Sequence, residues 1–408
     1  MKFLNIKLEM KVLVISHMYP STFNEVLGIF VHEQVKELVK QGCEVKVVSP
    51  VPWSPFPVNK MSAKWKAYSK IPKQQMWEGI EVFYPRYIEF PRNYVQGLSG
   101  LFMYLGIRTI IDNIYRKYKF DIIHAHVAYP DGYVGLKLKH KYKVPLVVTI
   151  HGLDVCSCAP HKPTIERNSR LRKTIIQVFE GANKVIGVSS KVRDIILKYY
   201  SNADKVVFVN NGVSAINMSK NNGVSENQKI KIISVGYLNI RKGHEYVIRA
   251  LVGLKNEGFD FEYLIVGDGE NRWFLENLTK KLMVEDKVKF VGRKNQSEVY
   301  SYLNESDIFC LPSWDEAFGV VYIEAMSVGL PVIACKGQGI EDVITDGITG
   351  LLAKPKDTAS VEDALRKLIR NPRLRHEIGQ QAKELILSKF TWSANVKRYI
   401  EIYQEILS

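Results

Sequence analysis

Residues 315–334 have the sequence DEAFGVVYIEAMSVGLPVIA, and the fold class can be predicted by starting from this segment. It follows an apolar run at 307–311 that predicts a buried strand, and helical spacing predicts a helix that begins near Phe318. A second apolar run, Pro331–Ala334, predicts the next strand. Strands that are apolar at nearly every position, joined by a helix, are typical of a parallel sheet buried on both faces.

The same alternation of strands and helices continues toward both ends of the chain. The polar segment 214–228 has neither helical nor strand periodicity, which predicts an interdomain linker. The predicted fold class is α/β, with Rossmann-like domains at 1–213 and 229–390 whose mostly parallel sheets face each other across a cleft. The last helix, 391–408, is expected to pack back on the first domain. The predicted strands lie at 11–16, 44–49, 121–125, 145–150, 184–188, 205–209, 231–235, 262–266, 287–291, 307–311 and 331–334.

The composition is that of a globular protein. Hydrophobic residues make up 46% and charged residues 24% of the 408 residues, so apolar side chains suffice for large cores. No run of about 18 apolar residues predicts a membrane-spanning helix. Met1–Met10 lacks the apolar region and cleavage site of a signal peptide, and the five scattered cysteines argue against a disulfide framework. We therefore expect a cytoplasmic protein.

The positive charge is confined to the first half of the chain. The whole chain has 57 basic and 42 acidic residues, a net charge of +15. Residues 1–213 hold 31 basic and 16 acidic residues, whereas residues 214–408 hold 26 of each. The first half is therefore expected to meet an anionic partner, and nucleic acid, a phospholipid surface and a phosphorylated acceptor all fit this charge.

Ligands of such sheets bind beyond the carboxyl ends of the strands, so the residues after each strand are the candidates for a site. Gly236 follows one strand and leads to Arg241 and Lys242 at the start of a helix. Two cations beside unpaired helical N–H groups favour an anion. Gly267 follows the next strand, where a glycine lets a ligand approach the backbone.

Glu316 and Glu324 are candidates for contact with one extended ligand. Eight helical residues rise about 12 Å, which is too far for the carboxylate pair of a glycosidase. Glu324 stands among Val, Ile and Met residues, where a carboxylate without a partner is costly to bury. Vicinal hydroxyls, such as those of a ribose, would satisfy it.

The first half offers a glycine and a histidine at equivalent places. Gly28 precedes a predicted helix at 29–41 and could admit a phosphate, and His151 ends a strand, where it could donate a hydrogen bond or move a proton. His124 and His126 end another strand, but no third ligand suggests itself. We predict no metal site.

These segments together resemble glycosyltransferase family 4, whose members are retaining enzymes with the GT-B fold. The most specific element is Glu316-x7-Glu324 within 315–334. Segment 28–38 is similar to the branch of bacterial teichuronic acid and exopolysaccharide glycosyltransferases. The supporting segments, in chain order, are GIFVHEQVKEL (28–38), HGLD (151–154), NNGV (210–213), VGYLNIRKG (235–243), IVGDGE (265–270) and DGITGLL (346–352).

The resemblance implies a nucleotide diphosphate sugar as donor, most simply linked to UDP, with no metal or other cofactor. It implies catalytic roles for Lys242 and Arg241 at the diphosphate, for Glu316 at the sugar hydroxyls and for His151 near the anomeric carbon. Glu324 would bind the ribose. The donor site implied in this way comprises Gly28, Gly236, Lys242, Gly267, Glu316, Phe318, Gly319, Val320 and Glu324.

One departure from the family concerns a phosphate contact. Tyr237 stands where the family commonly has Arg. One cation is therefore missing from its usual place, and we expect Arg241 to compensate.

The expected partners of the first domain are a lipid-linked or glycan acceptor and the anionic inner face of the cell membrane, without nucleic acid. Residues 53–94 interleave basic and aromatic side chains, Tyr84 and Tyr87 among the latter, as suits peripheral binding to such a surface. The alternative is an exposed basic face over buried aromatic rings. The residues proposed for acceptor or membrane contact are Lys60, Lys64, Trp65 and Lys66.

Other functions also fit parts of the sequence. A nucleotide-sugar epimerase can share the GT-B fold, and a non-catalytic protein could bind a nucleotide sugar without transferring it. A nucleic-acid-binding protein would account for the basic half but not for Glu316 and Glu324 after a strand.

Overall fold

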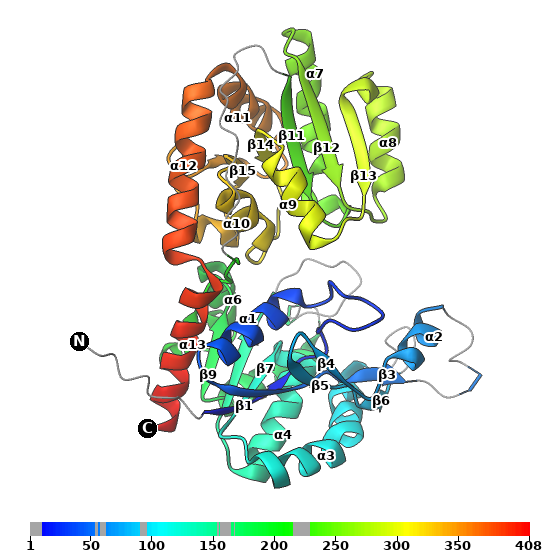
Figure 1. Ribbon diagram of the computed structural model, residues 1–408, viewed down its shortest axis with the longest axis vertical. Coiled ribbons are helices and arrows are strands. Elements are labelled where there is room, and N and C mark those ends of the chain that lie inside the picture. Colours follow the sequence, from blue (N-terminus) through cyan, green and yellow to red (C-terminus); the bar gives the residue numbers. More distant parts are fainter. Residues whose placement is uncertain are drawn as a thin grey trace. The chain divides into compact units, whose positions relative to one another are not determined.

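The computed structural model describes residues 10–53, 56–57, 63–89, 96–152, 155, 165–166, 168–214 and 229–408, except for the side chains of residues 64 and 96. It divides into two compact units, which Figure 1 shows coloured along the sequence. Unit 1 comprises Met1–Asn210 and Trp392–Ser408, and unit 2 comprises Asn211–Thr391. Unit 1 is thus built from two separate segments of the chain. Beyond Ser214, the predicted linker lies outside the described residues.

An eight-stranded sheet forms the centre of unit 1. The strands lie in the order β10 (Val206–Phe208), β9 (Lys184–Gly187), β8 (Leu146–Ile150), β7 (Ile122–His126), β1 (Lys11–Ile15), β2 (Glu44–Val48), β5 (Ile80–Phe83) and β4 (Gln74–Trp77). Neighbouring strands are parallel, except that β4 pairs antiparallel with β5. Every residue of β7 and β8 is buried, as expected for central strands of a parallel sheet that is covered on both faces.

Residues 51–88 contain structure that the periodicity did not predict. β3 (Val51–Trp53) pairs with β6 (Arg86–Ile88), and α2 (Ala63–Lys70) precedes β4. Tyr84 and Tyr87, which we expected on an aromatic surface, are buried. That expectation was wrong for these two residues, because their rings fill the interior and the Tyr84 hydroxyl donates a hydrogen bond of 2.6 Å to the carbonyl of Pro20.

Helices cover the sheet of unit 1, and the last of them comes from the C-terminal segment (Figure 1). Gln34 donates a hydrogen bond of 2.9 Å to Asn395, and the amide of Asn395 donates one of 2.7 Å to the carbonyl of Asn210. The buried contact joins α1 to α13, so the C-terminal helix belongs to the core of unit 1. The helices are α1 (Ile29–Lys40), α3 (Ser99–Tyr118), α4 (Tyr133–Tyr142), α5 (Ser169–Gly181), α6 (Ser190–Leu197) and α13 (Trp392–Leu407).

A six-stranded parallel sheet forms the centre of unit 2. The strands lie in the order β13 (Val288–Gly292), β12 (Phe261–Val266), β11 (Ile230–Val235), β14 (Ile308–Cys310), β15 (Val332–Cys335) and β16 (Leu351–Ala353). One apolar core packs these strands against the flanking helices. The helices are α7 (His244–Asn256), α8 (Arg272–Lys281), α9 (Gln296–Asn304), α10 (Val320–Ser327), α11 (Thr358–Arg370) and α12 (Pro372–Lys389).

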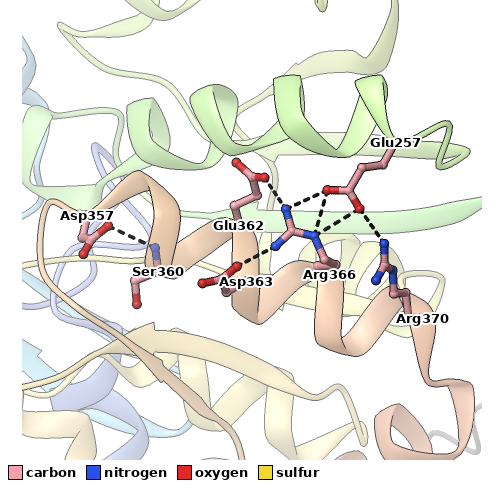
Figure 2. Close-up of polar contacts among 7 residues, drawn as sticks. All are labelled: Glu257, Asp357, Ser360, Glu362, Asp363, Arg366 and Arg370. Atoms are coloured by element: carbon pink, nitrogen blue, oxygen red, sulfur yellow. Dashed lines mark hydrogen bonds and ion pairs between the residues drawn. The ribbon is translucent and has the colours of Figure 1, made fainter.

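An ion-pair network joins the end of α7 to α11 (Figure 2). Glu257 follows α7 and accepts hydrogen bonds from the guanidinium groups of Arg366 and Arg370, at 2.8 Å from each. Arg366 also pairs with Glu362 and Asp363 of its own helix. The approach of the helices is close enough that a Cβ at Gly253 would lie 2.2 Å from the Glu362 carboxylate.

The prediction of an α/β fold with mostly parallel sheets is confirmed, and the observed strand ends differ from the predicted ones by one residue at most. The helix predicted from Phe318 begins two residues later, because Gly319 has a φ of +87°, outside the helical region. None of the described helices combines the length and the hydropathy needed to span a bilayer.

Candidate functional site

The carboxyl edge of the unit 2 sheet brings together the loops that follow β11, β12, β14 and β15. β11 and β14 are neighbours and run parallel, so the loops after them lie side by side. The main chain joins them, because the N–H of Trp314 donates a hydrogen bond of 2.9 Å to the carbonyl of Arg241. Residues more than 70 positions apart in the sequence therefore meet at one place.

Lys242 and Glu316 form the centre of this site. The Lys242 ammonium lies 2.6 Å from Glu316 Oε2, and both side chains are largely buried, at 18% and 17% exposure. The Ser313 hydroxyl donates a second hydrogen bond, of 3.0 Å, to the same oxygen. Burial raises the pKa of Glu316, but Lys242, Ser313 and Arg241 together hold this pKa below its usual value of 4.5. The site thus contains a carboxylate and an ammonium that are paired with each other.

Glycines allow these loops to pack closely. Gly243 has a φ of +72°, and a Cβ there would lie 2.3 Å from the carbonyl oxygen of Pro312. A Cβ at Gly267, whose φ is +139°, would lie 1.9 Å from the carbonyl oxygen of Gly236. Gly267 therefore serves packing between adjacent loops, whereas a Cβ at Gly236 would meet only the Lys242 side chain, at 3.7 Å.

The loop that carries Glu316 is fixed through its main chain. The N–H of Glu316 donates a hydrogen bond of 2.8 Å to the side-chain oxygen of Gln338. The Phe318 side chain is buried, so this residue can offer a ligand only its backbone. Gly319 caps α10, and Val320 is the first residue of that helix. The N–H groups at the start of α10 thus lie beside the Glu316 loop, as an anion site requires.

Glu324 lies on α10 and has one polar partner among the described residues. The Gln296 amide, at the start of α9, donates a hydrogen bond of 2.6 Å to Glu324 Oε1. Burial raises the pKa of Glu324, and the Gln296 bond opposes this rise. A partly buried carboxylate held by a single amide retains capacity to accept further hydrogen bonds.

The environment of Arg241 and Tyr237 differs from that of Lys242. The Arg241 guanidinium lies 3.4 Å from the carbonyl of Asp315, and the Arg241 side chain is half-buried. Tyr237 is 50% exposed, and a hydrogen bond to Glu270 raises the pKa of its hydroxyl. The position at which the resemblance implies an arginine thus holds a phenol that bonds a carboxylate.

Unit 1 places two predicted residues, Gly28 and His151, at the carboxyl edge of its own sheet. Gly28 precedes α1 with a φ of +66°, and a Cβ there would lie 2.1 Å from the carbonyl oxygen of Met18. His151 follows β8, and its ring lies 4.6 Å from the ring of Phe30 on α1. Burial lowers the pKa of His151 to about 3, so its imidazole is neutral.

The sequence did not predict two side-chain contacts at the carboxyl edge of the unit 1 sheet. His126 Nδ1 lies 2.9 Å from His151 Nε2, and the fully buried Asp131 lies 2.9 Å from His17 Nδ1. In the sequence, His126 and His151 each stand only as a residue at the end of a predicted strand. The signal that joins them is the pairing of β7 with β8, which periodicity does not reveal.

One group among the described residues has three side chains that could bind a metal ion. The ligand atoms of His32, Glu33 and Glu78 lie within 4.8 Å of one another. The Lys36 ammonium lies 3.2 Å from Glu33 and 2.7 Å from Glu78, so a side-chain cation already neutralises both carboxylates. This group lies on α1 and in the turn after β4, and the N–H of His32 donates a hydrogen bond of 3.2 Å to the carbonyl of Gly28.

The residues predicted for acceptor or membrane contact are only partly described. Lys60 and the Lys64 side chain lie outside the described residues. Lys66 is exposed on α2, and the partly buried Trp65 on the same helix lies 6.0 Å, between ring centroids, from Tyr68.

Two family models match this chain. The model described as Glycosyltransferase Family 4 matches residues 27–215, and the model described as Glycosyl transferases group 1 matches residues 216–385. A protein of Bacillus subtilis (strain 168) that is named as a teichuronic acid biosynthesis glycosyltransferase, TuaC, is 26% identical over 97% of this chain and 99% of its own.

Solved structures show the same fold. Sucrose-phosphate synthase from Thermosynechococcus elongatus superposes with a TM-score of 0.79 at 20% identity, over 98% of this chain and 99% of its own. Anabaena Alr3699/HepE, solved in complex with UDP and glucose, superposes with a TM-score of 0.72 at 18% identity, over 97% of this chain and 100% of its own.

Proposed function

This chain belongs to glycosyltransferase family 4 and has the GT-B fold, and from this premise we propose that it is a retaining hexosyltransferase that uses a nucleotide diphosphate sugar. The proposed donor is UDP-linked. The proposed acceptor is a glycan or a lipid-diphosphate-linked glycan of a bacterial cell-surface polysaccharide. The name of the Bacillus subtilis relative supports this class of acceptor.

The observation that carries the proposal is the pairing of Lys242 with Glu316 at the carboxyl edge of the unit 2 sheet. Their contact of 2.6 Å puts a cation and a hydrogen-bond acceptor within reach of adjacent parts of one sugar diphosphate. We assign the diphosphate to Lys242 and Arg241, and the hydroxyls of the transferred sugar to Glu316. The backbones of Phe318, Gly319 and Val320 contribute at the start of α10.

The ribose of the donor is assigned to Glu324. Its carboxylate is partly buried and is held by Gln296 through one oxygen, at 2.6 Å. Two vicinal hydroxyls would donate to the acceptor positions that this bond leaves. Because burial without such partners raises the pKa of Glu324, a bound ribose should stabilise the charged form.

The chemistry follows from where charge develops during transfer. As the bond between sugar and phosphate breaks, the diphosphate gains negative charge and the sugar becomes oxocarbenium-like. Lys242 and the N–H groups at the start of α10 stabilise this state more than the ground state, because the diphosphate then carries more charge. We propose that the positive charges of Lys242 and Arg241 make a metal unnecessary. We also propose that the acceptor attacks the sugar on the face that the diphosphate leaves, so that the anomeric configuration is retained.

Unit 1 is assigned to the acceptor, with His151 near the anomeric carbon and Gly28 facing the phosphate. We further propose that its basic surface holds the enzyme at the anionic inner face of the membrane. The exposed Lys66 on α2 and Phe56, which is 72% exposed, support this part. Co-flotation with anionic but not neutral liposomes at low salt tests it, and absence of flotation with both would contradict it.

One assay separates the proposed function from its alternatives. The purified chain is incubated without acceptor with nucleotide sugars that differ in base and in sugar, and each product is identified by mass spectrometry and NMR. Slow release of nucleoside diphosphate and of a sugar whose initial anomeric configuration matches the donor supports a retaining transferase. Conversion into an epimeric nucleotide sugar identifies an epimerase, and binding without any turnover identifies a non-catalytic protein.

A further inference from the structure

Three histidines at the ends of two neighbouring strands lie in a row in unit 1, and of these His124 and His126 are buried whereas His151 is partly buried. The rings of His126 on β7 and His151 after β8 are nearly parallel, with an interplanar angle of 13°, and His126 Nδ1 lies 2.9 Å from His151 Nε2. The ring of His124 lies 4.2 Å from that of His126. Burial lowers the pKa of His124 and His151 to about 3 and that of His126 well below its usual value, so all three rings are neutral.

A contact between two neutral imidazoles has one donor and one acceptor. Each neutral ring carries a single N–H, so the proton in this contact belongs either to His126 Nδ1 or to His151 Nε2. In the first arrangement His151 carries its own proton on Nδ1 and can donate it to a ligand. In the second arrangement His151 Nδ1 is a bare acceptor. The direction of one hydrogen bond therefore decides what His151 can do.

The second nitrogen of His126 discriminates between these arrangements. His126 Nε2 is buried without a hydrogen-bond partner among the described residues. If His126 donates through Nδ1, this nitrogen is a bare lone pair, whereas in the other arrangement it is a buried N–H without an acceptor. Among buried backbone groups an orphaned N–H is the rarer of the two defects, and we carry this preference over to the imidazole. It favours donation from His126 to His151.

The surroundings of His126 hold its ring in place. His124 accepts or donates hydrogen bonds at both nitrogens, 2.8 Å from the Thr149 hydroxyl and 2.7 Å from the hydroxyl of Tyr403 on α13. Val127, directly after His126, has a φ of 80° and a ψ of 149°, a region that β-branched residues almost never adopt. Strain of this kind persists only where the fold imposes it and is concentrated at functional sites.

We propose that His126 is a positioning residue that fixes His151 as an Nδ1–H donor toward an oxygen of the transferred sugar. The orientation of His151 rests on the hydrogen bond to His126, and its use in catalysis rests on the proposed function. The direction of the hydrogen bond between His126 and His151 can therefore be tested separately from its effect on catalysis.

The first test reads the tautomer in the intact chain without any substrate. Long-range ¹H–¹⁵N correlation spectra of protein labelled at histidine distinguish Nδ1–H from Nε2–H in neutral imidazoles, and His151→Gln assigns the His151 signals. A proton on His151 Nδ1 supports the proposal. A proton on His151 Nε2 overturns it, whatever reaction the protein catalyses.

The second test compares two substitutions of His126 that differ in reach. The Asn amide stands where Nδ1 stood, two bonds from Cβ, and can still donate to His151. The Gln amide reaches the Nε2 position instead. We expect His126→Asn to keep kcat within a factor of a few and His126→Gln to lower kcat by about tenfold, the effect of one lost hydrogen bond. The KM for the donor should change little in both variants.

A merely structural role of His126 predicts the opposite order. Gln fills more of the space of the imidazole than Asn, so packing alone would favour His126→Gln. Equal losses of kcat in the two variants, or a larger loss in His126→Asn, would overturn the positioning role. If neither variant folds, the tautomer in the unmodified chain decides. If no nucleotide sugar is turned over, the proposed function fails while the tautomer result stands.

Discussion

The Lys242 ammonium lies 2.6 Å from Glu316 Oε2, although 74 residues separate the two positions. Each group stabilises the charge of the other at a site from which water is largely excluded. A donor that binds here must place a negative group near the lysine and hydroxyl donors near the carboxylate, or it would break the pair without replacing it.

Replacing Lys242 by alanine should lower turnover by about 10²–10³, the usual cost of losing one contact to a charge that develops in the transition state. The measurement is kcat with saturating donor in the assay described above. Arg249→Ala, which removes an exposed arginine paired with Glu245 on α7, is the matched control and should leave kcat unchanged. A folded Lys242→Ala variant with normal kcat would remove Lys242 from the mechanism.

The two carboxylates of the site should respond to pH with opposite signs. The pKa of Glu316 lies below 4.5 in the folded chain, so its stabilising effect is present above about pH 4.5 and is lost as the pH falls through the folded pKa. Glu316→Gln should therefore be less stable than the unmodified chain at neutral pH and should approach it under acid conditions.

The pKa of Glu324 is raised by burial, so folding loses stability as the pH rises through 4.5 to the folded pKa. Glu324→Gln should consequently match the unmodified chain in acid and exceed it at neutral pH. Tm recorded against pH checks both variants, and a shift of the same sign in both would contradict this account.

Gly243→Ala should destabilise unit 2 more than Gly337→Ala. Both glycines have nearly the same positive φ, +72° and +73°, so the backbone cost of about 1–2 kcal/mol is common to both. Only at Gly243 would the new Cβ meet a backbone atom, the Pro312 oxygen at 2.3 Å, since nothing lies within 4 Å at Gly337. Urea unfolding measures the free energy of unfolding of both variants. Equal losses of stability would show that the loops of Gly243 and Pro312 can move apart without cost.

Gln296→Ala should weaken the binding of UDP by about tenfold, because it removes the hydrogen bond that orients Glu324. Glu324→Ala should weaken binding further, since the ribose contact itself is then lost. Calorimetric titration with UDP measures both effects. The control is Ser301→Ala on the same helix α9, which removes a hydrogen bond to Glu305 directly after that helix. Normal affinity of Glu324→Ala would place the ribose elsewhere.

Arg366→Ala should lower the Tm at low salt, because it removes the centre of the network in Figure 2 and leaves Glu257 with Arg370 alone. The effect should shrink at high salt, which screens exposed charges. Arg373→Ala removes a single pair with Glu377 at a side chain that is 90% exposed, and it should change the Tm less. A loss that is independent of salt would indicate packing of the arginine stem instead.

The strands of both sheets that lie outside residues 51–88 could be predicted from the sequence, because buried parallel strands are mostly apolar. The strand ends, and with them Lys242, Glu316 and Glu324, followed from the same pattern. The strands within 51–88 could not be predicted, since they are short and only partly buried. The partners of the site residues, Gln296 for Glu324 and His126 for His151, depend on which strands are neighbours, and this order is set by tertiary packing.

The helix α13 of unit 1 is synthesised after all of unit 2. During synthesis the first 210 residues leave the ribosome long before Trp392–Leu407, so the face of α1 that receives this helix stays uncovered while unit 2 is being formed. Tyr399 and Tyr403, which reach Thr149 and His124, are also absent until then. The three histidines therefore acquire their final support only after all of unit 2 has been synthesised, which delays the maturation of unit 1.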